Sequence, residues 1–165
     1  VKNINWNKLD LVFLSLPNGG AQKIIKKTFN KNKKLKYIDL SADFRIKDPL
    51  VYYKNYKIKH KAKNLIKYSL YSISEFNKKN IYDYRIISNP GCYPTSIQLP
   101  LVPLIKKNLI SSDNIVIDSK SGYSGAGKKY KNKFNFKKIR ENFSFSSNQK
   151  KYLSIPEIRK LIKNI

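Results

Sequence analysis

The pattern of apolar positions predicts a strand–turn–helix unit near the start of the chain. The continuous apolar run 11–16 is typical of a strand that is buried on both faces of a parallel sheet. The turn 17–20 follows, and apolar side chains then recur at helical spacing over 21–29, with lysines on the opposite face. Units of this kind bind ligands at the carboxyl ends of their strands. The turn lacks the phosphate-cradling pattern GxGxxG. Taken alone, its asparagine, Asn18, is therefore interpreted as a turn residue and not as a cofactor contact.

Three shorter apolar runs, 37–40, 85–88 and 115–118, predict further strands. The last of them leads into 119–129, a loop rich in small residues. The backbone of such a loop can approach a ligand closely and offer N–H groups to anionic oxygens, or the loop can act as a flexible linker. The sequence leaves these two roles open.

Cys92, the only cysteine, lies where the run 85–88 turns into a helical pattern. Such a turn places the sulfur near exposed backbone N–H groups and the positive end of a helix dipole, which stabilise a thiolate nucleophile. The alternative role of a lone cysteine is that of a small buried hydrophobe. The turn and helix-start signals around it favour chemistry. Pro100 and Pro103 are predicted to kink or shorten the helix that follows.

Two other stretches carry candidate polar chemistry. Asp43 and Arg45 could form an ion pair, or Arg45 could face a carboxylate or phosphate; the residues alone favour the structural pair. The stretch 52–68 interleaves tyrosines with lysines, as in surfaces that stack nucleic-acid bases. Tyrosines that cover the side of an α/β domain are the simpler explanation. Nothing beside His60 in sequence makes it a proton carrier.

The formal net charge of +25 at first suggests a nucleic-acid partner. Lysine supplies nearly all of the 35 basic residues and is spread along the whole chain, as a genome with A/T-rich codons would produce. Dedicated nucleic-acid binders more often use arginine for bidentate contacts. We therefore expect only nonspecific binding of polyanions through charge.

The numbers of cysteines and histidines and the hydropathy of the chain restrict the remaining classes of protein. One cysteine cannot form an internal disulfide, and one histidine gives no metal-ligand cluster. No apolar run approaches 18 residues and no signal peptide is visible, so we expect a cytoplasmic protein without a membrane partner. The chain contains no methionine, so we expect that it begins inside a longer product or at an alternative start codon.

Taken in order, five segments resemble N-acetyl-gamma-glutamyl-phosphate reductase, an arginine-biosynthesis enzyme related to aspartate-semialdehyde dehydrogenase. Two family motifs are complete: Asp-Leu-Ser-Ala-Asp-Phe-Arg at 39–45 and Asn-Pro-Gly-Cys-Tyr-Pro-Thr at 89–95. The segment 13–19 is similar to the family's Leu-Pro-His-Gly turn with Asn in place of His, and 121–128 is similar to Ser-Gly-Val-Ser-Gly-Ala-Gly-Arg. The segment 71–75 is an eroded match to Tyr-Gly-Leu-Pro-Glu.

The resemblance implies a fold and a reaction. It implies a partial Rossmann-like parallel sheet over residues 1–91, followed over 92–165 by the start of an α+β substrate domain. It also implies a homo-oligomer that uses NADPH to reduce N-acetyl-gamma-glutamyl phosphate through a thioester on Cys92. The implied cofactor contacts are Pro17, Asn18, Ser124 and Gly125. The implied substrate contacts are Arg45, Asn89 and Ser121.

Two departures from the family pattern bear on activity. The family's Gly-rich dinucleotide turn would precede Val1, and much of its substrate domain would follow Ile165. In the family's His-x-His-x-Pro-Glu-Ile motif, the histidine positions read Tyr152 and Ser154 here. Neither side chain is a good base near pH 7. A catalytically impaired or truncated family member is therefore the alternative, and a basic nucleic-acid-binding protein is a third.

Overall fold

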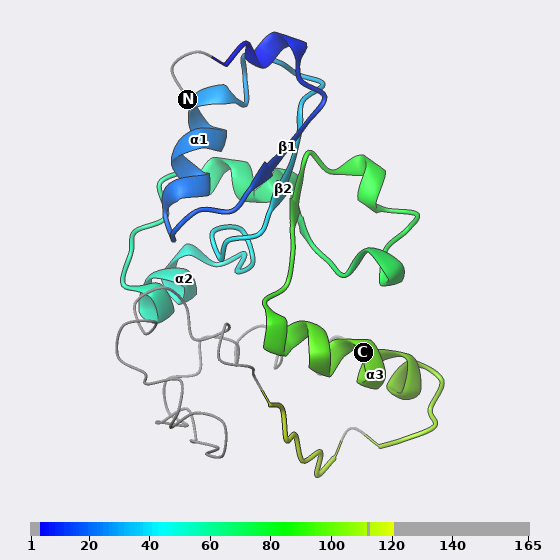
Figure 1. Ribbon diagram of the computed structural model, residues 1–165. Helices are drawn as coiled ribbons and strands as arrows, with labels where there is room; N and C mark the ends of the chain where they lie inside the picture. The colour runs from blue at the N-terminus through cyan, green and yellow to red at the C-terminus, as the bar shows by residue number, and fades with distance from the viewer. Residues whose placement is uncertain (1–3, 112, 121–165) are drawn as a thin grey trace, which may run out of the picture.

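The computed structural model describes residues 4–111 and 113–120 (Figure 1). Four parallel strands form one sheet in the order β1-β2-β4-β3. The strands are β1 (Leu11–Leu14), β2 (Lys36–Asp39), β3 (Ser69–Tyr71) and β4 (Ile86–Ser88). The α-helices are α1 (Gly20–Thr28), α2 (Pro49–Tyr56) and α3 (Cys92–Lys106). Short 3-10 helices connect them: η1 (Trp6–Lys8), η2 (Lys63–Tyr68), η3 (Ser74–Phe76) and η4 (Ile81–Asp83). The predicted α/β class is confirmed.

The core lies between the sheet and α1. Ala21 and Ile25 on one side of α1 are fully buried against Tyr37 of β2 and Ile86 of β4. The hydroxyls of Thr28 and Tyr37 lie 2.9 Å apart, which satisfies both groups inside this core. Leu65 of η2 belongs to the same cluster, so α1 and η2 cover one face of the sheet together.

The opposite face of the sheet is less covered. The strand register places Phe13, Ile38, Ile87 and Leu70 in one row across it. Phe13 is 64% exposed and Leu11 is 44% exposed. The expectation that β1 is buried on both faces is therefore wrong: β1 lies at the edge of the described sheet, and only its side toward α1 is packed.

Two further expectations concern single segments. Pro100 and Pro103 are expected to kink or shorten the helix that contains them; α3 runs unbroken from residue 92 to 106, so they do not shorten it, and the kink stays a prediction. Each proline removes only one N–H donor from a helix of 15 residues. The predicted strand 115–118 is absent: the segment pairs with no described strand, and Val116 is 94% exposed.

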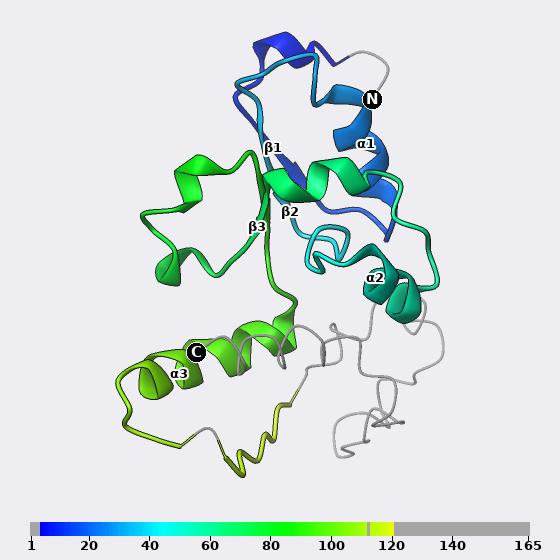
Figure 2. The same ribbon diagram turned by 180° about the vertical axis from the view of Figure 1, so that it is seen from behind.

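Both α2 and α3 lie at the carboxyl-terminal end of the sheet (Figures 1 and 2). α2 starts where Asp48 accepts hydrogen bonds from the backbone N–H groups of Leu50 and Val51, with Pro49 in the first turn. α3 continues directly from β4, and Gln98 Nε2 donates to the hydroxyl of Tyr71 at the end of β3 (2.9 Å). The sheet thus presents its ligand-binding end toward both helices.

Candidate active site

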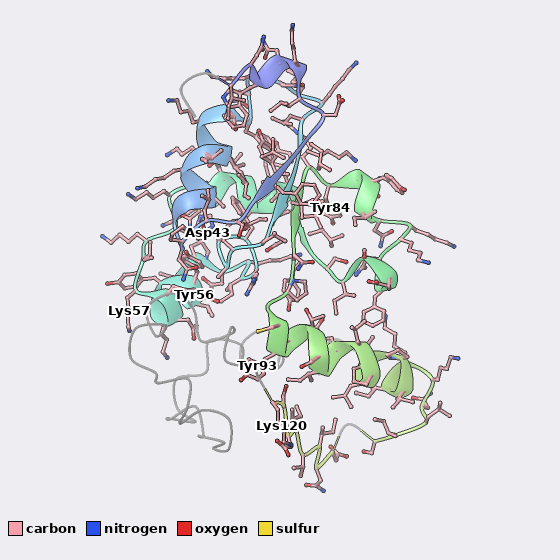
Figure 3. The ribbon with its side chains drawn as sticks, viewed as in Figure 1. Asp43, Tyr56, Lys57, Tyr84, Tyr93 and Lys120 are labelled. Carbon is pink, nitrogen blue, oxygen red and sulfur yellow. The ribbon has the colours of Figure 1, made fainter. Side chains whose placement is uncertain are left out.

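The segment 39–45 after β2 connects two candidate parts of a site. Asp39 ends β2, and its carbonyl accepts a hydrogen bond from Asn89 N (2.8 Å), at the turn before α3. Asp43 contacts the start of α1 instead. Figure 3 labels Asp43 beside the lower end of α1. One short segment therefore contacts both the turn at Cys92 and the turn after β1.

Cys92 is exposed and is the first residue of α3, with Gly91 as its N-cap. The alternative role as a buried hydrophobe is therefore wrong. The first intrahelical bond runs from Thr95 N to the Gly91 carbonyl (2.9 Å). The backbone N–H groups ahead of it lack carbonyl partners inside the helix, and they point the same way as the helix dipole. Cys92 therefore lies at the end of the helix that favours a negatively charged group.

Arg45 holds the turn that precedes Cys92. Its Nε donates to the Asn89 carbonyl (2.9 Å) and its Nη2 donates to the Leu40 carbonyl (3.1 Å). A Cβ atom on Gly91 would lie 2.9 Å from Arg45 Nη1, so glycine allows the guanidinium this close approach. The Asp43 carboxylate contacts the start of α1 instead. The ion pair between Asp43 and Arg45 that the sequence favoured therefore does not hold either side chain in place.

Asp39 is a fully buried carboxylate with uneven hydrogen bonding. Its Oδ1 accepts from Ser41 N (2.9 Å) and Ser41 Oγ (2.6 Å). Its Oδ2 and the Oγ of Ser88, the residue opposite it on β4, are buried and have no hydrogen-bond partner among residues 4–111 and 113–120. Burial raises the pKa of Asp39 to about 6, against the lowering effect of the Ser41 bonds.

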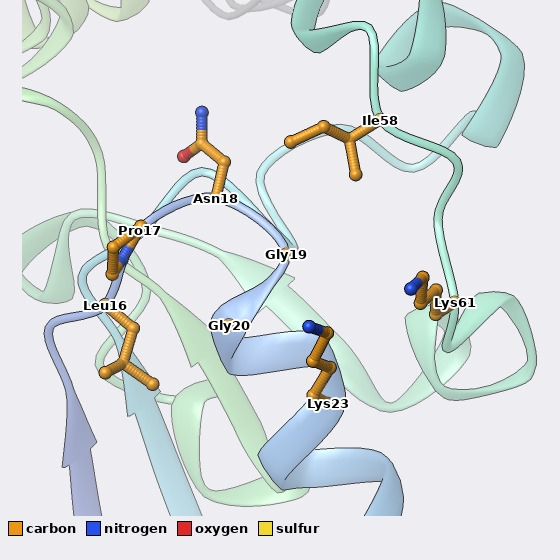
Figure 4. Close-up of a pocket in the computed structure, with 8 residues that line it drawn as sticks. All are labelled: Leu16, Pro17, Asn18, Gly19, Gly20, Lys23, Ile58 and Lys61. Atoms are coloured by element: carbon orange, nitrogen blue, oxygen red, sulfur yellow. The ribbon is translucent and has the colours of Figure 1, made fainter.

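A pocket of about 290 Å³ opens beside the turn after β1 (Figure 4). One wall is the turn 16–20 with Lys23 of α1, and the other carries Ile58 and Lys61. Lys23 lies on α1 with its side-chain nitrogen beside Gly20, and Lys61 lies on the facing segment (Figure 4). Neither lysine makes an ion pair with a residue in the described ranges. The pocket is therefore suited to an anionic group.

The start of α1 is capped by Asp43. Gly19 N donates to Asp43 Oδ1 (2.6 Å), and Gln22 N donates to Oδ2 (3.1 Å). Gly19 has φ +86°, a left-handed conformation that glycine adopts without strain. Two N–H groups that could cradle a phosphate are thus occupied by the carboxylate.

His60 is part of the buried structure. Its Nδ1 accepts a hydrogen bond from Ala62 N (3.2 Å), so its Nε2 carries the proton and donates to the Asp43 carbonyl (2.8 Å). Burial lowers the pKa of the ring, which favours this neutral tautomer. Both ring nitrogens are therefore engaged, and His60 is not available for proton transfer. The rings of Tyr52 and Phe44 pack edge-on against it.

A second pocket, about 390 Å³, lies between α3 and the extended segment 115–120. Ser96 Oγ, one turn after Cys92, lies 3.0 Å from Ser119 Oγ. The segment that precedes Ser121 therefore passes close to the start of α3.

The structure places the expected site residues in three groups. Pro17 and Asn18 line the pocket after β1. Asn89, Arg45 and Cys92 meet at the turn before α3. The remaining expected residues, Ser121, Ser124 and Gly125, lie outside the described ranges, as do Tyr152 and Ser154 at the family's histidine positions.

Sequence reasoning missed the group around Asp43. Tyr52 OH donates to Asp43 Oδ1 (2.7 Å), and Gln22 Nε2 donates to the same oxygen (3.2 Å). Gln22, Asp43 and Tyr52 are all fully buried. The complete motif at 39–45 signalled that Asp43 matters, but its partners lie far from it in sequence.

Two family models match the chain. The model described as "Semialdehyde dehydrogenase, NAD binding domain" covers residues 1–84. The model described as "Semialdehyde dehydrogenase, dimerisation domain" covers residues 92–165. The chain therefore belongs to the semialdehyde dehydrogenase family.

Individual relatives confirm the narrower resemblance. N-acetyl-gamma-glutamyl-phosphate reductase of Afipia carboxidovorans is 43% identical over 145 residues, covering 87% of this chain and 41% of the relative. A probable chloroplastic N-acetyl-gamma-glutamyl-phosphate reductase of Arabidopsis thaliana is 42% identical over 165 residues, covering 100% of this chain and 40% of the relative. The reductase of Ehrlichia canis is 47% identical over 129 residues, covering 78% of this chain and 36% of the relative.

The chain thus spans about two fifths of the length of these relatives. Its NAD-binding family model indicates a nicotinamide cofactor, and its second model indicates an oligomer. Among the described residues, no helix has both the length and the apolar character needed to cross a membrane.

Proposed function

We propose that this chain carries the nucleophile and part of the cofactor pocket of an NADPH-dependent reductase of N-acetyl-gamma-glutamyl phosphate. The observation that carries the proposal is the exposed Cys92 thiol at the first position of α3, on a turn held by Arg45. The relatives' names supply the substrate, and the motif resemblance implies the arginine-biosynthesis context. Residues 1–91 would belong to the dinucleotide-binding domain and 92–165 to the catalytic domain, within a cytoplasmic homo-oligomer.

In the proposed reaction, the Cys92 thiolate attacks the acyl carbon of the acyl phosphate. A C–S bond forms, the bond from that carbon to the phosphate oxygen breaks, and inorganic phosphate leaves. Bound NADPH, held beside Pro17 and Asn18, would supply the hydride needed to reduce a thioester on Cys92. The N–H groups at the start of α3 favour the thiolate both before attack and after the semialdehyde departs. Arg45 and Asn89 would support the substrate beside the turn.

The pocket after β1 fits one part of a dinucleotide. Its volume lies near the lower end of that of small-ligand sites, so it can hold only a portion of the cofactor. Lys23 and Lys61 provide positive charge toward a phosphate group of the cofactor, which both NAD and NADP carry. Pro17 and Asn18 lie at the same opening. Ser121, Ser124 and Gly125 would complete the site from the loop after Lys120.

The test is phosphate-dependent reduction of NADP by N-acetylglutamate semialdehyde, with NAD as the comparison cofactor. We expect Cys92→Ser to abolish turnover, because a serine hydroxyl is a far weaker nucleophile than a thiolate at neutral pH. A single-turnover version incubates the chain with the acyl phosphate and measures the mass of the acylated protein. Turnover that survives Cys92→Ser would remove the thiol from the mechanism.

The second candidate is a catalytically impaired or truncated family member. The observation behind it is the sequence at the family's histidine motif, which reads Tyr152 and Ser154. Loss of a general base typically lowers the rate about a hundred- to ten-thousand-fold. This candidate predicts slow or no acylation of Cys92 and no rapid alkylation by iodoacetamide at pH 7. Since Cys92 is the only cysteine, the mass of the alkylated chain reports on it alone.

A further inference from the structure

We propose that Asp43 is a positioning residue that fixes the two walls of the pocket after β1 relative to each other. The inference rests on the proposed function, because that pocket is the part of the chain assigned to the nicotinamide cofactor. Asp43 does not line the pocket itself. It is fully buried behind both walls.

The first wall, the turn 16–20, is held directly by the Asp43 carboxylate. Gly19 N donates to the buried Oδ1 over 2.6 Å. Gln22 N, one residue before Lys23, donates to Oδ2 (3.1 Å). The left-handed backbone of Gly19 and the first turn of α1 are thereby fixed at the pocket's edge.

The second wall, 58–61, is tied to the same residue by two routes. Lys61 N donates to Gln22 Oε1 (2.7 Å), and Gln22 Nε2 donates to Asp43 Oδ1 (3.2 Å). His60 Nε2 donates to the Asp43 carbonyl (2.8 Å). The backbones that carry Lys23 and Lys61 therefore share one buried anchor.

The contacts of Asp43 also determine which groups of the pocket remain to bind an anion. The carboxylate occupies the N–H groups at the start of α1, the place where dinucleotide folds often hold a phosphate. A phosphate group in this pocket must then be held by Lys23 and Lys61 from the two walls. The spacing of those walls depends on Asp43, so we expect the residue to control affinity for the cofactor without touching it.

Asp43→Asn tests the proposal, because it places an NH₂ donor where the structure needs an acceptor. We expect NADPH binding, measured by NMR titration of the purified chain, to weaken about tenfold, the order of a lost hydrogen bond to a charged group. Hydrogen exchange at the Gly19 and Lys61 amides should accelerate, whereas exchange at Ile38 in the sheet should not. Tyr52→Phe is the matched control: it removes one donor to Asp43 and keeps the carboxylate. It should lower thermal stability and leave NADPH affinity within about twofold.

Folded Asp43→Asn protein that binds NADPH like the unaltered chain would overturn the proposal. If the unaltered chain binds no dinucleotide, the cofactor assignment fails, and hydrogen exchange then decides the role of Asp43. Faster exchange confined to Gly19 and Lys61 supports positioning. Equal acceleration at Ile38 shows a general loss of stability and overturns it.

Discussion

The α1 side of the molecule and the α3 side carry the two halves of the candidate site in different ways. On the α1 side, buried donors surround Asp43, and the apolar face of the helix is packed. On the α3 side, the thiol is exposed, and Leu99 and Leu104 are 44% and 37% exposed. The pocket walls thus depend on core packing, whereas the nucleophile depends on a turn supported at its base by Arg45.

The segment 39–45 explains how the two halves are coordinated. Asp43 holds the pocket walls, Arg45 holds the turn before Cys92, and the Asp39 backbone bonds that turn as well. Substitutions that disturb packing on the α1 side should therefore lower the free energy of unfolding strongly. Substitutions on the α3 side should change the reactivity of Cys92 more than the free energy of unfolding. Three substitutions test this contrast.

The largest effect on stability is expected from Ile25→Ala. Ile25 is fully buried between α1 and the sheet, so its removal leaves a cavity that should cost about 3 kcal/mol of unfolding free energy. Leu99→Ala in α3 is the matched control and should cost less than about 1 kcal/mol, since much of that side chain is already in water. Urea denaturation measures both. Equal losses would show that the two sides are packed alike.

Asp39→Asn should change the pH dependence of stability. The pKa of Asp39 is raised from 3.8 to about 6 in the folded chain, so the native state holds the proton more tightly than the unfolded state does. Stability from this group is therefore complete below about pH 4 and is lost as the pH rises through 6. The shift corresponds to roughly 3 kcal/mol at neutral pH.

Asparagine stays uncharged, so the variant should lack this decline and be more stable than the parent at pH 7. Denaturation at pH 4 and at pH 7 measures the difference between the two chains. Parallel pH profiles for the two chains would mean that Asp39 ionises without a penalty. Asp118→Asn is the control, since that carboxylate is exposed and paired with Lys120.

Gly91→Ala should have the smallest effect on stability, about 1 kcal/mol or less, because the arginine can move. The new Cβ would displace the Arg45 guanidinium from its position 2.9 Å away. We expect the rate of Cys92 alkylation to change. In an Arg45→Ala background the same substitution should have little further effect, since the contact is already gone. If the effects of the two substitutions on the alkylation rate simply add in this double-mutant cycle, Gly91 does not act through Arg45, and the support of the turn by Arg45 is wrong.

The sequence predicted the sheet better than its surroundings. The runs at 11–16, 37–40 and 85–88 were found because apolar strands of a parallel sheet stand out from polar turns. β3 was missed, since Ser69–Tyr71 contains a single aliphatic residue, Leu70, and does not form an apolar run. The run 115–118 has the composition of a strand but no described partner, and composition alone cannot supply one.

The site was predictable where it rests on motifs and unpredictable where it rests on distant contacts. Cys92 follows from the turn in which it lies. The role of Asp43 does not, because its partners Gly19, Gln22 and Tyr52 are 9 to 24 positions away. Arg45 was the nearer charge and therefore looked like the natural partner. Donors that are distant in the sequence determine which hydrogen bonds Asp43 makes. The sequence alone does not show which of these donors come close to it.

The half-exposed outer face of the sheet has a consequence for handling the protein in solution. Copies that each carry +25 repel one another in dilute buffer, which keeps Phe13 and the edge of β1 apart from their counterparts. At 0.1 M salt this repulsion reaches only about 10 Å. Self-association should therefore increase as salt is added, and Phe13→Lys should suppress it, as light scattering would show. The salt washes that strip bound polyanions from a basic protein would, for this chain, be the step that brings its molecules together.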